Sequence, residues 1–175
     1  MLLDEIISTL SDENGSLTSA LLKTKVLLHS IGKKDLASWV THELKGYPDE
    51  GSIPEYRKIS SEVHGHVASI AWQMTDTTLP IMHLKDEQRK RFTSSPCMMS
   101  ISSIEESVRG DRSQSDHKLI RPLPPEFGGL LRKGLAPGVN VISAWCEINM
   151  IEVEGILTEV RSRLLDFALE LRDVV

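Results

Sequence analysis

The chain has 175 residues, of which 40% are hydrophobic and 26% are charged, and its formal net charge is −5 at pH 7. This length suits one domain, the composition is that of an ordinary globular protein, and the acidic balance argues against broad binding to nucleic-acid phosphates. No apolar run approaches the roughly 18–20 residues of a membrane span. Asp4 and Glu5 stand where a signal peptide carries basic residues, which argues against export. Cys97 and Cys146 are far apart in the sequence and lack the spacing of metal ligands. We therefore expect a cytoplasmic protein with free thiols.

Three helices are predicted at the start of the chain. Apolar residues recur at helical spacing from about Leu2 to Leu10, and Ser16, which follows an Asn-Gly turn, is suited to cap a second helix through about Ser30. Gly32 lies where a helix C-cap belongs, and Asp35 is a candidate cap for the third helix.

The periodicity changes to alternation after the third helix. The segment from Ile59 to Trp72 is rich in β-branched residues and predicts a long strand or a bent hairpin arm, with Gly65 at a bulge or a close-packing position. We expect a turn at Thr75–Thr78 and a second short strand at Leu79–Leu84.

The second half of the chain alternates weak helical and strand signals. Lys85 to Arg109 is weakly helical with a break before its middle, and Lys118–Leu123 predicts a short strand. Val139–Ile148 is apolar on both of its faces, which is typical of a central strand covered on both sides.

The closing helix is the clearest element. Asn149 and Glu152 stand in the N-cap to N3 relation of a capping box. Apolar residues then recur at a spacing of three or four residues, which predicts a helix that continues to the last few residues. The predicted fold class is α+β, with an N-terminal helical trio, a mainly antiparallel sheet of about four strands and a long C-terminal helix, in one domain over residues 1–175. We expect the three tryptophans to be core residues: Trp39, Trp72 and Trp145.

Residues 36–57 form the most distinctive stretch, LASWVTHELKGYPDEGSIPEYR. A helix carrying Trp39 and Glu43 on one face ends at Gly46, and a loop bounded by prolines then leads to Tyr56 and Arg57. An aromatic residue, an acid and a Gly-Tyr pair in this order are more particular than an amphipathic helix requires.

Two anchors make the chain resemble the AbiTii family of bacterial abortive-infection proteins. One anchor is WVTHELKGY followed by PEYR, at Trp39–Tyr47 and Pro54–Arg57, and the other is VRSRLLDFALEL at Val160–Leu171. The resemblance implies a role in defence against bacteriophage, often as the N-terminal module of a larger protein. It implies no established active site, so no catalytic residues are assigned.

The matched positions predict a packed interface between the first helices, the loop and the last helix. We expect Glu43 to pair with Arg57 or with Arg161, and removing one partner of such a buried pair costs about 3–5 kcal/mol. The structural or interface candidates are Trp39, Glu43, Tyr47, Tyr56, Arg57, Arg161 and Phe167.

A histidine pair offers a candidate metal site. His64 and His66 are two residues apart, so on a strand both imidazoles project from one face, with Glu62, Asp76 and His83 as nearby donors. The plainer alternative is a surface or hydrogen-bonded histidine pair. We expect no cofactor.

A short basic segment offers a candidate nucleic-acid contact within residues 85–91. Its members are Lys85, Arg89, Lys90 and Arg91. The plainer alternative is a solvated helix face, because Asp86 and Glu87 lie among them.

Two nucleophile hypotheses have weaker support. Cys146 lacks a local catalytic signature and lies on a strand expected to be buried. Ser102, Ser103 and Ser107 could be combined with Asp111 and His117 in a triad, but a triad is defined by geometry and not by composition.

The leading functional hypothesis is a non-enzymatic interaction, oligomerisation or sensing module in phage defence, which binds a protein partner or a second copy of itself and no membrane. The alternative is a toxic enzyme acting on nucleic acid through His64, His66 and the basic segment. A small-ligand sensor is a third hypothesis.

Overall fold

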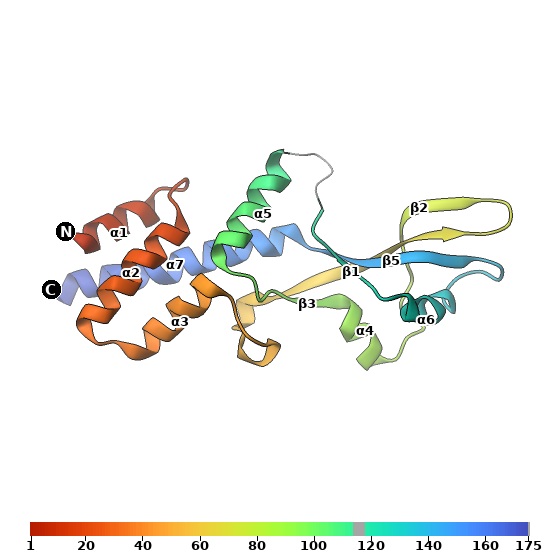
Figure 1. The fold of residues 1–175 in the computed structure, drawn as a ribbon, viewed down its shortest axis with the longest axis horizontal. Helices are drawn as coiled ribbons and strands as arrows, with labels where there is room; N and C mark the ends of the chain where they lie inside the picture. The colour runs from red at the N-terminus through yellow and green to blue at the C-terminus, as the bar shows by residue number, and fades with distance from the viewer. Residues whose placement is uncertain (114–117, 175) are drawn as a thin grey trace. The chain divides into compact units, whose positions relative to one another are not determined.

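A computed structural model describes residues 1–113 and 118–174, and it confirms the α+β class (Figure 1). The chain divides into two compact units. The helical unit contains residues 1–57, 97–113 and 153–174, and the sheet unit contains residues 58–96 and 118–152.

The predicted N-terminal trio of helices is confirmed in the helical unit. Its elements are α1 (Leu2–Ser11), α2 (Leu17–Ile31), α3 (Lys34–Lys45), α5 (Ile101–Ser113), most of α7 (Met150–Val174) and the short 3-10 turns η1 (Glu50–Ser52) and η2 (Glu55–Arg57). The core of this unit is apolar, with fully buried side chains such as Ile6, Leu21, Ile104, Ile156 and Leu164. The helices therefore bury one apolar stripe each, as their spacing predicts.

The predicted caps are confirmed around α2 but not at α3. The Ser16 hydroxyl accepts a hydrogen bond from the backbone N–H of Ser19, and Gly32 ends the helix in the left-handed conformation with φ of 71°. The prediction that Asp35 caps α3 is wrong, because the helix already begins at Lys34 and Asp35 lies in its first turn. An acidic side chain there still interacts favourably with the helix dipole.

The sheet unit is antiparallel throughout its described pairings. Strands β1 (Lys58–Ala68), β2 (Gln73–Thr78), β5 (Asn140–Ile148) and β4 (Ile120–Pro122) lie in the order β2-β1-β5-β4, and β3 (Ser94–Pro96) also pairs with β1. Two helices and a 3-10 turn complete the unit: α4 (Asp86–Thr93), α6 (Gly128–Arg132) and η3 (Pro125–Phe127). The described sheet has five strands where about four were expected.

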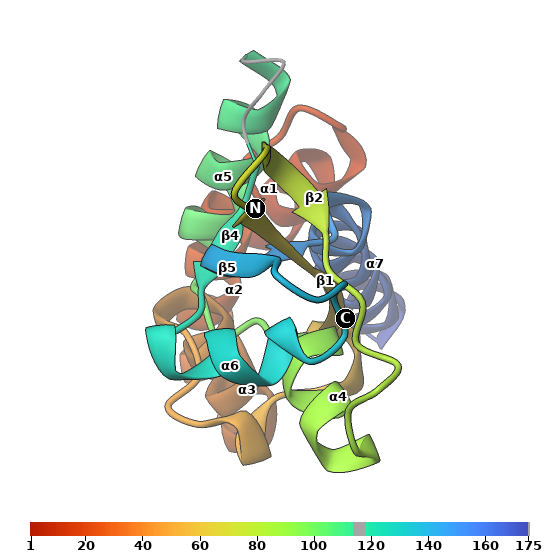
Figure 2. The same cartoon turned by 90° about the vertical axis from the view of Figure 1, so that its right-hand side faces the viewer.

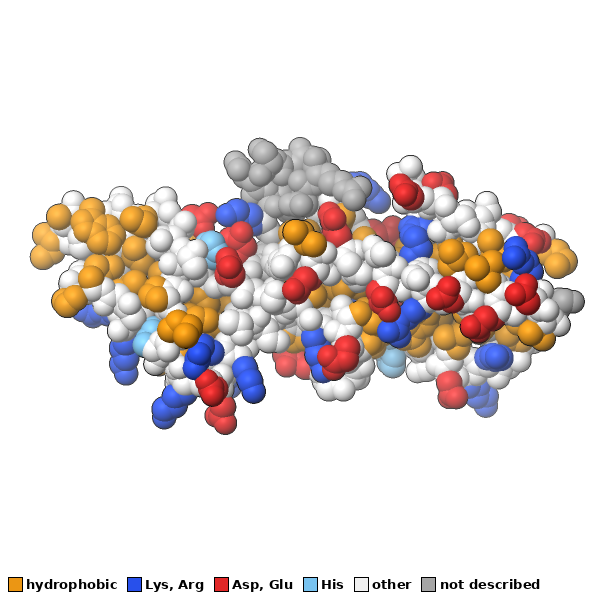
Figure 3. All heavy atoms as spheres, turned by 180° about the vertical axis from the view of Figure 1, so that it is seen from behind, with side chains coloured by type: hydrophobic (Ala, Val, Ile, Leu, Met, Phe, Trp, Pro, Cys, Tyr) orange, Lys and Arg blue, Asp and Glu red, His pale blue; other side chains and the backbone are white. Residues whose placement is uncertain are grey.

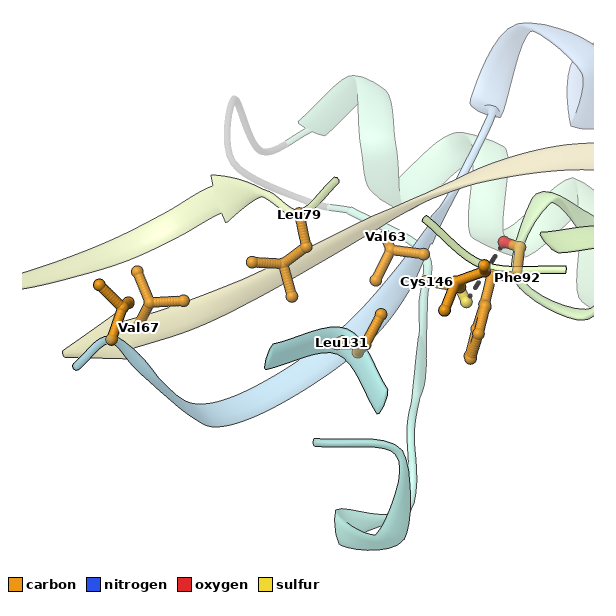
Figure 4. Close-up of a cluster of buried hydrophobic side chains, with 8 residues drawn as sticks. Val63, Val67, Leu79, Phe92, Leu131 and Cys146 are labelled. Atoms are coloured by element: carbon orange, nitrogen blue, oxygen red, sulfur yellow. Dashed lines mark hydrogen bonds between the residues drawn. The ribbon is translucent and has the colours of Figure 1, made fainter. Parts of the chain in front are cut away.

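One face of this sheet packs under α4 and α6 (Figure 2). Side chains from β1 and β5 point toward Phe92 of α4 and Leu131 of α6, and Leu79 closes the same cluster (Figure 4). The cluster contains Val63, Val67, Leu79, Leu84, Phe92, Leu131, Val139 and Cys146. Gly65 is buried on the same strand, and a Cβ there would lie 2.6 Å from the carbonyl oxygen of Ser143, so the predicted close-packing position is confirmed.

Two predictions for the segment after β1 are wrong. The predicted turn at Thr75–Thr78 lies inside β2, where Thr77 and Thr78 pair with β1. The chain reverses instead at residues 69–72. The predicted strand Leu79–Leu84 is irregular: its two terminal leucines are buried in the core, but Pro80 lacks the N–H that a ladder needs.

Two burial predictions are also wrong. Ile142 of β5 is 61% exposed, so this strand is not covered on both faces. None of the three tryptophans is a core residue: Trp72 at the β1–β2 turn is 45% exposed, and Trp39 and Trp145 are only partly buried. The N-cap of α7 is confirmed, since the Asn149 side chain accepts from the N–H of Ile151 and Glu152, but the Glu152 side chain bonds to Ser60 and does not complete the box.

Candidate functional site

A buried ion pair lies at the centre of the helical unit. Glu43 of α3 and Arg57 of η2 are both fully buried, and the Arg57 Nη2 donates to Glu43 Oε2 while its Nε lies 3.3 Å from Oε1. Arg57 is therefore the confirmed partner of Glu43. The two-pronged geometry matches the planar guanidinium to the carboxylate.

Aromatic side chains satisfy the rest of this carboxylate. The Tyr47 hydroxyl donates to Glu43 Oε1 at 2.7 Å, the Tyr56 hydroxyl donates to the same oxygen, and the Trp39 indole N–H donates to the Tyr56 hydroxyl at 2.9 Å. The Arg57 guanidinium carbon also lies 4.8 Å from the centre of the Tyr47 ring. Every polar group in this set has a partner, as burial requires.

The second half of the Arg57 guanidinium fixes the segment before α5. Its Nη1 donates to the carbonyl oxygens of Cys97 at 3.1 Å and of Met99 at 2.7 Å. Gly46 makes the approach of this segment feasible, because it has a φ of 91° and a Cβ there would lie 2.7 Å from the Met98 carbonyl oxygen. The Gly-Tyr pair of the sequence thus ends α3 and docks it on residues 97–99.

Burial and the carboxylate shift the pKa values of the surrounding groups. Burial is the largest cause that raises the pKa of Tyr56 to about 12, and the hydrogen bond to Glu43 and its charge add to it. The pKa of Tyr47 is raised by the same causes. For Arg57, burial opposes the charged form, but the hydrogen bond and charge of Glu43 outweigh burial and raise the pKa. This cluster is a closed structural network with its charges held in place.

Arg161 of α7 has a different structural role in the same unit. Its guanidinium donates to the carbonyl oxygens at the end of α1 and in the following turn, which belong to Thr9, Leu10, Asp12 and Gly15. Carbonyls at a helix C-terminus lack partners within the helix, so Arg161 caps α1 from a helix far along the chain. Phe167, on the same helix, is partly buried.

A second polar cluster lies on the opposite face of the sheet from the apolar core. His64 of β1 is opposite Trp145 of β5, and its Nδ1 lies 3.0 Å from Asp76 Oδ1 and 3.5 Å from Glu147 Oε2. The ammonium of Lys118 lies 3.1 Å from Asp76 and 3.4 Å from Glu147. We call His64, Asp76, Glu147 and Lys118 the sheet-face cluster.

Backbone irregularities aim Asp76 into the sheet-face cluster. The β1–β2 register shifts between Gly65 and Val67, and Asp76 has a φ of 51°, in the left-handed region. A bulge of this kind re-aims a side chain that a regular strand would place elsewhere. The pKa of Asp76 is lowered by its hydrogen bond to Lys118 first and by that to His64 second.

His66 has a different environment from His64. Its Nδ1 accepts a hydrogen bond from the backbone N–H of Asp76 at 3.1 Å, and its ring meets the Trp145 ring edge-on at 4.8 Å between centres. His66 therefore supports the bulge, while His64 is the histidine that faces both carboxylates. The His64 Nε2 lies 3.5 Å from Glu62, the third acid on this face.

The basic segment does not form one continuous face. Arg89, Lys90 and Arg91 are consecutive on α4, where successive residues are about 100° apart around the axis. Arg89 pairs with Asp86, and Lys85 precedes the helix at its N-cap. Of the three basic residues on α4, Lys90 and Arg91 are exposed and Arg89 is partly buried, and the two exposed side chains leave the helix in different directions.

The described residues give little support to the nucleophile hypotheses. Cys146 is fully buried, burial raises the pKa of its thiol, and its Sγ donates to the Phe92 carbonyl. Ser100 bonds to Ser102 and Ser103, and His117 of the triad hypothesis lies outside the described residues.

The β1–β2 turn carries exposed apolar side chains. Ile70 is completely exposed, and Trp72 and Met74 are about half exposed. In Figure 3, hydrophobic side chains gather at this end of the sheet unit. Trp72 is the kind of residue that dominates protein interfaces. We call Ile70, Trp72 and Met74 the hairpin tip.

These observations define the class of protein: an α+β protein whose most distinctive residues stabilise the fold. The chain belongs to the AbiTii family, since the family's model matches residues 1–174. Family membership places it in abortive-infection defence against bacteriophage. No significant match is found among curated proteins or solved structures. Each helix in residues 1–113 and 118–174 is too short or too polar to cross a bilayer.

Sequence reasoning missed Glu147 and Lys118 of the sheet-face cluster. Glu147 lies in an apolar strand, and its relation to His64 follows from the β1–β5 register, which no local pattern gives. Lys118 precedes a strand of only three residues. The alternation of Glu62, His64 and His66 was the one local signal for this face.

Proposed function

We propose that this chain acts in phage defence as a non-enzymatic interaction module that binds a protein surface through the hairpin tip. The observation that carries the proposal is the exposure of Ile70, Trp72 and Met74 on a hairpin whose outer strand, β2, ends the sheet. Apolar side chains that gather at one exposed place favour association, and an end strand offers free backbone groups to a partner.

The location of the family-defining residues supports this proposal. Glu43 and Arg57 are fully buried and their polar atoms are occupied by Tyr47, Tyr56 and backbone carbonyls. A substrate would have to break that network to reach these groups. The residues that carry the family resemblance therefore stabilise the fold, and the hairpin tip binds the partner.

Light scattering after size exclusion, combined with affinity capture from phage-infected cells, tests the proposal. The chain should form an oligomer or retain a specific protein, and Ile70→Ser with Trp72→Ser should abolish that association. Leu22→Ser with Val26→Ser is the matched control, because these side chains are also exposed but lie on α2. The control should associate normally.

Two outcomes would contradict the proposal. The proposal fails if the chain is a monomer that captures no protein. It also fails if the α2 control loses association as completely as the hairpin-tip variant. The alternative is a toxic enzyme acting on nucleic acid. It would be favoured if expression of the chain arrested growth and the double variant His64→Ala with His66→Ala relieved the arrest.

A further inference from the structure

The sheet-face cluster has the composition of a transition-metal site. One ligand comes from each of three adjacent strands: His64 from β1, Asp76 from β2 and Glu147 from β5. One ligand atom of each lies within 4.8 Å of the others. An imidazole nitrogen and two carboxylate oxygens form a donor set that suits a zinc-class ion.

Two of the three separations between these atoms are close to those around one shared ion. Ligands at about 2.0–2.2 Å from a tetrahedral zinc lie about 3.3–3.6 Å from one another. The His64 Nδ1 is 3.0 Å from Asp76 Oδ1 and 3.5 Å from Glu147 Oε2. Binding would therefore require small side-chain adjustments and no rearrangement of the strands.

The far side of the histidine ring supports the same interpretation. Histidines that ligate metals commonly donate their other ring nitrogen to a carboxylate, which orients the ring and raises its basicity. The His64 Nε2 lies 3.5 Å from Glu62, and the His64 ring stacks on Trp145 with centres 6.5 Å apart. Both contacts hold Nδ1 toward the two carboxylates.

Lys118 occupies the position of the competing cation. Its ammonium contacts both Asp76 and Glu147, and these carboxylates raise the pKa of Lys118. The lysine side chain is about half exposed and can swing into solvent on its flexible stem. A divalent ion would replace one positive charge by two at the same carboxylates.

We propose that the sheet-face cluster binds one zinc-class divalent ion through His64, Asp76 and Glu147, with Lys118 as the group that the ion displaces. The ion would join three neighbouring strands beside the β1–β2 bulge and leave a fourth position for water. This inference does not depend on the hairpin tip, because it concerns a different face and different residues.

Calorimetric titration of Zn²⁺ into the chelator-stripped full chain tests the proposal. The chain should bind one equivalent. Asp76→Asn and Glu147→Gln should each lower the affinity by more than about 100-fold, whereas Glu62→Gln, which changes the carboxylate beside the far ring nitrogen, should lower it by about 10–100-fold. Asn tolerates the left-handed backbone at residue 76, so this variant keeps the bulge.

Lys118→Met gives the most specific test, because it should raise the affinity for Zn²⁺. Lys90→Met is its matched control: it removes an exposed lysine of the same unit and should leave the affinity unchanged. His29→Gln, which removes an exposed imidazole from α2, should also bind normally. Wild-type affinity in Asp76→Asn and Glu147→Gln, or equal affinity in Lys118→Met and wild type, would overturn the proposal.

Discussion

The two polar clusters of this protein contain similar groups in opposite settings. In the helical unit, Glu43 and Arg57 are completely buried and every partner is internal. In the sheet unit, His64 faces acids whose side chains stay partly exposed, and Lys118 is 46% exposed. A carboxylate and a cation that are buried away from water hold the fold together. On an open strand face the same groups remain available to a ligand.

The largest difference is expected when one ion-pair partner in each cluster is replaced by glutamine. Glu43→Gln leaves the Arg57 charge buried beside a neutral group and should lower the free energy of unfolding by about 3–5 kcal/mol. Denaturant titration followed by circular dichroism measures this change.

His64→Gln is the control from the sheet-face cluster. It removes pairs whose acid partners are partly exposed and should change the free energy of unfolding by less than about 1 kcal/mol. Equal effects of Glu43→Gln and His64→Gln would remove the distinction between the closed and the open cluster.

An intermediate effect is expected at Arg161, whose carbonyl partners close the end of α1. Arg161→Lys keeps the charge but loses the planar fork, so the free energy of unfolding should fall by about 1.5–3 kcal/mol. The same denaturant titration measures it. Arg163→Lys is the control on the same helix. Arg163 pairs with Glu159 at an exposed site and lies over the Tyr56 ring, and lysine keeps the positive charge there, so the change should cost about 0.5 kcal/mol or less. A cost at Arg161 no larger than at Arg163 would show that α1 needs no such cap.

The sequence predicted the parts of this fold that depend on local chemistry. Ser16 and Gly32 mark the ends of α2 because a cap needs only neighbouring backbone groups. The long stripe of α7 and the stop at Gly46 are local for the same reason. The pairing of Glu43 with an arginine was also accessible, because few groups can neutralise a buried acid, but the sequence left Arg57 and Arg161 as alternatives.

The errors concern features that the tertiary fold decides. Thr75–Thr78 has turn-like polarity but lies in strand β2, where Thr77 and Thr78 pair with β1. Trp72 is exposed because the turn carries it away from the core. The sheet-face cluster depends on two registers and a bulge, so its Glu147 and Lys118 were not predicted. Local patterns indicate which residues alternate but not which residue lies opposite.

The central claim, that the residues around Glu43 and Arg57 form a closed structural network, is tested most directly by the ultraviolet absorbance of tyrosinate as pH rises. The chain has two tyrosines, Tyr47 and Tyr56, and both belong to this network. Their pKa values are raised above the usual 10.0, to about 12 for Tyr56, so the folded state holds the phenolic protons more tightly than the unfolded state. The stability from this difference is complete below pH 10 and is lost as pH rises toward and through the folded-state pKa.

The account predicts that neither tyrosine ionises near pH 10 while circular dichroism reports a folded chain, and that tyrosinate forms above that pH together with unfolding. Ionisation of either tyrosine near pH 10 in a chain that is still folded would contradict it.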